Sequence, residues 1–146
     1  MANFVLFGLL LIAFAIGLHR GVGGGRGSKI GPALLAAAGV GLALCGFKTE
    51  PDLSTAPQTL HGWLHLIGFF IMAGGLLAGA FALWRRLRQD ALWRGYGRYS
   101  LATGLLAIAS FGVPGQASIY LLLAAMLIWL ELLAIRLLAL EDQPTG

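Results

Sequence analysis

The stretch GWLHLIGFFIMAGGLLAGAFALW, residues 62–84, is a long apolar run near the middle of this chain. It contains no Asp, Glu, Lys or Arg. It is longer than the roughly 20 residues with which an α-helix crosses ~30 Å of hydrocarbon at ~1.5 Å per residue. We therefore predict that this stretch forms a helix spanning a lipid bilayer.

Similar apolar segments lie on both sides of it, at residues 3–18, 30–47, 99–113 and 118–140. The last of them also reaches spanning length, and the shorter ones can span where flanking residues snorkel or the bilayer thins. Of the 146 residues, 58% are hydrophobic and 11% are charged, whereas soluble domains carry about a quarter charged residues. The sequence predicts an all-α polytopic bundle of about five spanning helices, with residues 1–146 as a single transmembrane domain and 141–146 as its tail.

The charges predict how this bundle lies in the membrane. Of the 10 basic residues, all except Lys48 fall in the first connection, in the third connection or near the end of the last segment. Short basic loops stay in the cytoplasm, so we expect the N-terminus outside and the C-terminus inside. The net charge of +4 then reflects orientation and a surface for anionic headgroups, and we expect no nucleic-acid partner.

Aromatic residues accompany the arginines of the third connection. We expect Trp84, Trp93, Tyr96 and Tyr99 to form an interfacial belt, on a short amphipathic stretch that lies on the headgroups.

The polar segment KTEPDLSTAPQTLHGWLH, residues 48–65, interrupts the apolar runs on the predicted outer face. His61 and His65 are spaced i, i+4, which places both on one face of a helix. Such a pair is a common half-site for zinc, and Asp52 or Glu50 would add an oxygen ligand. This pattern makes a metal site, with zinc as the cofactor, one hypothesis for the segment.

A structural role is the other hypothesis for the same histidines. Thr59 has the residue type and position of a helix N-cap, so the helix would begin just before the pair. The imidazoles would then fasten the outer loop to the helix by hydrogen bonds to Asp52, Ser54 or Thr55. Both hypotheses remain open at the level of sequence.

Glu131 is the acidic residue inside the last apolar segment. A charged group near the middle of a spanning helix costs about 2.5–3.5 kcal/mol on insertion scales. Glu131 is therefore either a proton- or ligand-binding group or a partner in a hydrogen bond between helices. Arg136, five residues on, is expected to snorkel to the interface.

Several short motifs together resemble a known family. They are GFKTEPD at residues 46–52, HGWLH at 61–65, RYS at 98–100 and the stretch 129–138 of the last segment. This combination is similar to the bacterial and archaeal membrane family called domain of unknown function 998. The resemblance implies a multi-pass protein of the bacterial or archaeal cytoplasmic (inner) membrane.

The chain departs from the family pattern in three ways. It resembles the last five of the usual six helices. It has F-K-T-E-P-D where members often have F-P-T-D-P, and Gln116 is followed by Ala117 rather than by arginine. A family site built from these elements would be degenerate in this chain or completed by a partner.

The family carries no known activity, so the function must be inferred from the residues. We expect a non-catalytic accessory or structural subunit of a membrane complex, or a bundle that binds lipid or pigment. The alternative is a metal-dependent membrane hydrolase or metal-binding protein that uses the HxxxH pair. A weaker likeness to the ceramidase and adiponectin-receptor-like hydrolases supports this alternative by analogy alone, because they have seven helices and more histidines.

Overall fold

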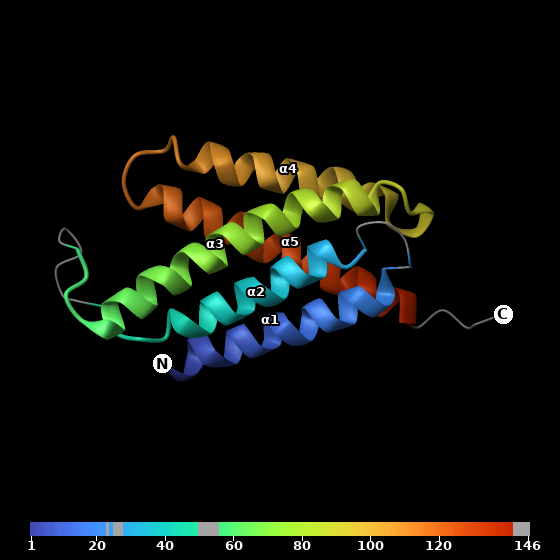
Figure 1. Ribbon diagram of the computed structural model, residues 1–146. Helices are drawn as coiled ribbons and strands as arrows, with labels where there is room; N and C mark the ends of the chain where they lie inside the picture. The colour runs from blue at the N-terminus through green and yellow to red at the C-terminus, as the bar shows by residue number, and fades with distance from the viewer. Residues whose placement is uncertain (23, 25–27, 50–55, 142–146) are drawn as a thin grey trace.

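The computed structural model describes residues 1–22, 24, 28–49 and 56–141 (Figure 1). Over these residues the chain is helical and contains no strand. The elements are α1 (Ala2–Gly21), α2 (Ile30–Leu44), α3 (Leu60–Leu87), the 3-10 helix η1 (Ala91–Trp93), α4 (Arg94–Ser110) and α5 (Ala117–Glu141). The predicted all-α helical bundle is confirmed.

The helices run up and down along one long axis, and each packs on the next in chain order (Figure 1). One end of the bundle therefore collects the C-terminal ends of α1, α3 and α5 with the N-terminal ends of α2 and α4. The first residue of α1 and the last turn of α5 lie at opposite ends. An odd number of antiparallel helices requires this separation of the chain termini.

Helix α3 begins where the sequence predicts, and α4 does not. The Thr59 hydroxyl accepts a hydrogen bond of 3.1 Å from the amide of Gly62, so the predicted N-cap is confirmed. Helix α4 starts at Arg94 rather than at residue 99. Asp90 caps η1 by accepting a hydrogen bond from the amide of Leu92 at 3.1 Å. The connection after α3 is therefore short, and α4 begins directly after η1.

Glycines bring α2 and α3 into backbone contact. A Cβ atom added at Gly41 would lie 2.5 Å from the Met72 amide nitrogen and 2.6 Å from the Gly68 carbonyl oxygen. Further along the same interface, one added at Gly75 would lie 2.7 Å from the Leu34 carbonyl oxygen. Small residues at such positions drive helix association in membranes. The GxxxG pair that Gly75 forms with Gly79 therefore packs within the bundle.

Helix α5 contacts both α1 and α4. The Leu137 side chain fills the space over Gly17 and Gly21 of α1. The Trp129 indole, which is completely buried, donates a hydrogen bond of 2.9 Å to the hydroxyl of Ser100 on α4. The Leu137 contact closes the ring of helices near the C-terminal ends of α1 and α5, and the Trp129 contact holds the middle of α5 against α4.

The outer surface of the bundle is apolar. Three helices of the described chain, α1, α3 and α5, are long and apolar enough to cross a membrane, and α2 is a shorter apolar helix. Large hydrophobic side chains such as Phe7, Phe70 and Leu127 are 59%, 65% and 62% exposed. Such a surface fits lipid rather than water. The chain is therefore a membrane protein that lies in a lipid bilayer; the crossing of all five helices remains a prediction.

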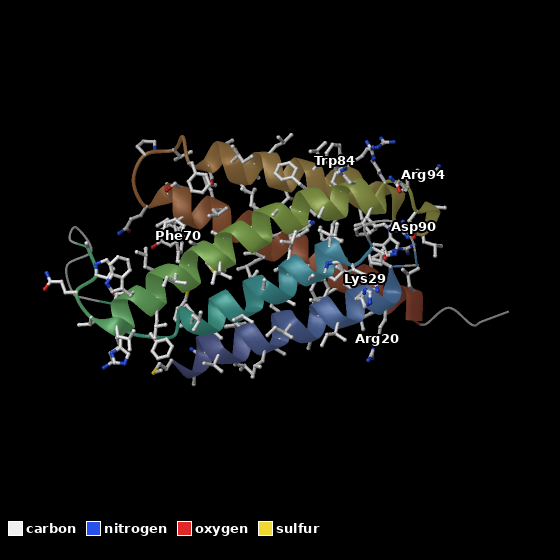
Figure 2. The ribbon with its side chains drawn as sticks, in the orientation of Figure 1. Arg20, Lys29, Phe70, Trp84, Asp90 and Arg94 are labelled. Atoms are coloured by element: carbon white, nitrogen blue, oxygen red, sulfur yellow. The ribbon has the colours of Figure 1, made fainter. Side chains whose placement is uncertain are left out.

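The expected aromatic belt is wrong for one of its members. Trp93 is completely buried and meets Tyr96 edge-on, with ring centroids 5.8 Å apart. The short turn between α3 and α4 places the Trp93 side chain inside the bundle and not among the lipid headgroups. Trp84 stays at the surface of this end, where Arg88 lies 5.2 Å over its ring (Figure 2).

Candidate functional site

Most charged side chains of the described residues gather at one end of the bundle. Arg20, Lys29, Asp90 and Arg94 all lie there, on four different elements or connections, while Phe70 lies toward the other end (Figure 2). We refer to these as the basic end and the histidine end, the latter because it holds the first turn of α3. The separation follows from the up-and-down topology, which returns every basic connection to the same side.

At the histidine end, both predicted histidines contact Phe47. The Nδ1 atom of His65 lies 3.0 Å from the Phe47 carbonyl oxygen. The His61 ring lies 5.7 Å from the Phe47 ring, centroid to centroid. The Cys45 thiol also points at the His65 carbonyl oxygen, with a sulfur–oxygen distance of 3.9 Å. These contacts fasten the segment after α2 to the first turns of α3.

The bond to Phe47 determines which tautomer the neutral His65 ring adopts. A carbonyl oxygen only accepts hydrogen bonds, so Nδ1 must carry the proton and donate. In the neutral ring Nε2 is then left with its lone pair. A histidine whose Nδ1–H is held by a carbonyl while Nε2 is available has the arrangement common among metal ligands. The same bond is a structural contact to Phe47, whereas the predicted bonds to Asp52, Ser54 or Thr55 stay a prediction, because those residues lie outside the described ones.

The acids proposed to complete a metal site, Glu50 and Asp52, lie outside the described residues, as do Ser54 and Thr55. Among the residues that the structure does describe, no group of three or more His, Cys, Asp or Glu is arranged to hold a metal ion. His61 is exposed and His65 is half-buried. The zinc site at His61, His65 and Asp52 therefore stays a prediction.

Glu131 lies on the outer surface of α5 and is exposed. Residues three, four and seven positions away on the same face are also exposed: Leu127 at 62%, Ile128 at 51%, Ile135 at 53% and Leu138 at 61%. Residues at these spacings form one stripe along a helix. We call these five residues the α5 stripe. Across the described residues, the Glu131 carboxylate has no hydrogen bond or ion pair within the chain.

Arg136 does not simply snorkel, as the sequence suggested. Its Nη2 donates a hydrogen bond of 2.8 Å to the Leu92 carbonyl oxygen, and its guanidinium carbon lies 6.0 Å over the Tyr96 ring. It thereby ties the end of α5 to the start of α4. Glu131 lies five residues earlier, about 7.5 Å along the helix at ~1.5 Å per residue.

An all-helical bundle whose outer surface is apolar, with helices long enough to cross a bilayer, belongs to the class of helical membrane proteins. Residues 1–137 match the family model described as "Protein of unknown function (DUF998)". The chain belongs to this family, which confirms the resemblance drawn from the GFKTEPD and HGWLH motifs. The chain has no significant match among curated proteins or among solved structures.

The geometry around His65 leads to a prediction for the two histidines. His65→Ala should lower the free energy of unfolding by about 1 kcal/mol, the usual contribution of one hydrogen bond. His61→Ala should change it by less than about 0.5 kcal/mol, as is usual for exposed side chains. Unfolding in detergent, followed by circular dichroism, measures both values. Equal losses in the two variants would contradict the assignment of His65 as the histidine that anchors this segment.

Proposed function

We propose that this protein is a non-catalytic accessory subunit of a membrane complex, in the cytoplasmic membrane of a bacterium or archaeon. Its N-terminus and histidine end face outward, and its basic end faces the cytoplasm. The α5 stripe is the surface that docks on a partner subunit. The observation that carries the proposal is the exposed carboxyl group of Glu131 in the middle of an otherwise apolar lipid-facing stripe.

The surroundings of that carboxyl group make its exposure costly. In an isolated bundle it would face hydrocarbon, at a cost of about 2.5–3.5 kcal/mol if charged near the bilayer centre. A spanning helix that offers a hydrogen-bond donor or a basic side chain at the same depth removes much of this cost. The apolar residues that flank Glu131 would pack against the same helix.

The partner is another protein rather than a second copy of this chain. In a twofold dimer that packs stripe against stripe, identical surfaces face each other, so Glu131 would meet Glu131. The basic side chain nearest in depth on α5, Arg136, already binds the Leu92 carbonyl oxygen and covers Tyr96. The chain therefore offers no matching cation on this face among its described residues.

Replacing Glu131 tests the proposal. When the chain is solubilised from its native membrane in mild detergent, the wild type should migrate as a complex larger than the chain alone. Glu131→Leu should dissociate it, because leucine cannot pair with a donor, while Glu131→Gln should retain more of the complex through its amide. The folded bundle itself should be unaffected by either change. A Glu131→Leu chain that stays in a complex of wild-type size would refute this function for the α5 stripe.

Metal binding is the second candidate function, favoured by the available Nε2 of His65. Metal content of the purified chain, measured beside the double variant His61→Ala/His65→Ala, distinguishes it from the first. Near-stoichiometric zinc that disappears in the double variant would support a metal-binding protein or hydrolase at the histidine end.

A further inference from the structure

A groove opens between α2 and α3 at the basic end. It encloses a cavity of about 720 Å³. Its walls are apolar, formed by Ile30 and Leu34 of α2 and by Ala78 and Phe81 of α3, and Arg85 and Arg86 line the same cavity one to two turns further along α3. The groove is thus lined by apolar side chains along most of its length. Guanidinium groups lie at the end where the membrane surface is predicted.

The charge at this end of the groove is positive. Arg86 pairs with Asp90 at 3.4 Å, and its side chain is only 10% exposed. Arg85 is exposed, and within the described part of the chain no carboxylate lies within ion-pair distance of it. Among the described residues, Arg86 is therefore paired with an acid and Arg85 keeps an uncompensated positive charge. Helix α2 also begins at Ile30 without a side-chain cap, so the positive end of its dipole adds to the field.

We propose that this groove binds one anionic phospholipid of the surrounding bilayer. The lipid phosphate pairs with the Arg85 guanidinium, a strong charge-assisted contact, and an acyl chain lies along Ile30, Leu34, Ala78 and Phe81. From Ala78 to Arg85 the groove is about 10 Å long at ~1.5 Å per residue, which suits a stretch of acyl chain below a headgroup. The exposed position of Ala78 leaves the groove open to lipid.

Two features favour a phospholipid over a soluble phosphate compound. The first is that most of the lining is apolar, so a water-soluble anion would gain nothing from burial there. The second is that the arginines lie at the end of α3 where the predicted bilayer interface falls, at the depth of a headgroup. This inference does not depend on the α5 stripe, which lies on a different helix.

Native mass spectrometry of the purified full chain tests the site, with dioleoylphosphatidylglycerol and dioleoylphosphatidylcholine as probes. The wild type should retain one phosphatidylglycerol molecule more tightly than phosphatidylcholine. Arg85→Gln should weaken phosphatidylglycerol binding about tenfold, as loss of a charged contact to phosphate implies. Ala78→Trp, which fills the groove but keeps both arginines, should abolish the tight site. The control Arg94→Gln changes an exposed arginine at the same end outside the groove, and it should leave the affinity within about twofold.

Several outcomes would overturn the proposal. Equal retention of the two lipids would show that binding does not depend on an anionic headgroup. Equal losses in Arg85→Gln and Arg94→Gln would indicate a diffuse basic surface rather than a site. Unchanged binding by Ala78→Trp would show that no acyl chain occupies the groove. Displacement of the lipid by glycerol phosphate at similar concentrations would reassign the site to soluble phosphates, and a chain dimer disrupted by Ala78→Trp would assign the groove to a second copy.

Discussion

Replacing Gly41 by valine should push α2 away from α3 and strongly destabilise the bundle. A Cβ atom there would lie 2.5 Å and 2.6 Å from backbone atoms of Met72 and Gly68. Backbone atoms cannot rotate away as a side chain does, so the whole helix must shift. Overpacking usually costs about 1–3 kcal/mol, and with backbone on both sides we expect a loss of about 3 kcal/mol. Titration with sodium dodecyl sulfate in mixed micelles, followed by circular dichroism, measures it.

Gly74→Val is the matched control, because an added Cβ atom at Gly74 meets nothing within 4 Å. Gly74 lies within α3, so valine in place of glycine improves helix propensity by a few tenths of a kcal/mol. We therefore expect Gly74→Val to leave stability unchanged to within about 0.5 kcal/mol. Similar losses in the two variants would mean that glycine matters here for flexibility and not for the close approach of two helices.

Replacing Trp129 by alanine should be the most damaging change in α5. The indole is completely buried and donates a hydrogen bond of 2.9 Å to Ser100, whose hydroxyl in turn donates to the Tyr96 carbonyl oxygen at 2.9 Å. Truncating a buried tryptophan to alanine costs about 3–5 kcal/mol, mainly through the cavity that remains. The same detergent titration measures the loss.

The control for this change is Trp63→Ala, because Trp63 is 48% exposed. Its removal should cost less than about 1 kcal/mol. Trp129→Phe keeps one aromatic ring but loses the pyrrole ring together with its N–H donor. Its cost should therefore fall between that of one hydrogen bond between helices in a membrane, about 1 kcal/mol, and that of Trp129→Ala. A Trp129→Ala chain as stable as Trp63→Ala would contradict the role of this side chain in attaching α5 to α4.

The sequence predicted those features that depend on local composition. Uninterrupted apolar runs are required wherever a helix faces lipid, so α3 and α5 could be located from hydropathy alone. The cap at Thr59 was also predictable, because it requires only a hydroxyl at the right distance from the helix. The family followed from short motifs at residues 46–52 and 61–65.

Features that depend on contacts between distant residues could not be predicted. Trp93 has the composition and neighbours of an interfacial residue, and only the short turn after α3 places it inside the bundle. The partner of His65 is the main-chain carbonyl of Phe47. Every residue has such a carbonyl, so the sequence does not indicate which one accepts the bond. Whether Glu131 faces inward or outward depends on how α5 rotates as Trp129 enters the core, which the nearly uniform apolar sequence around it does not determine.

Photocrosslinking from the α5 stripe tests the proposed subunit role most directly. A benzophenone amino acid in place of Leu127, which is 62% exposed, should form one discrete protein adduct in native membranes. The same probe in place of Leu9 on α1, which is 58% exposed, should yield only lipid adducts. We expect that the Leu127 adduct contains a second, different polypeptide and that Glu131→Leu abolishes it. An adduct of twice the mass of the chain, or lipid adducts alone at both positions, would contradict this expectation.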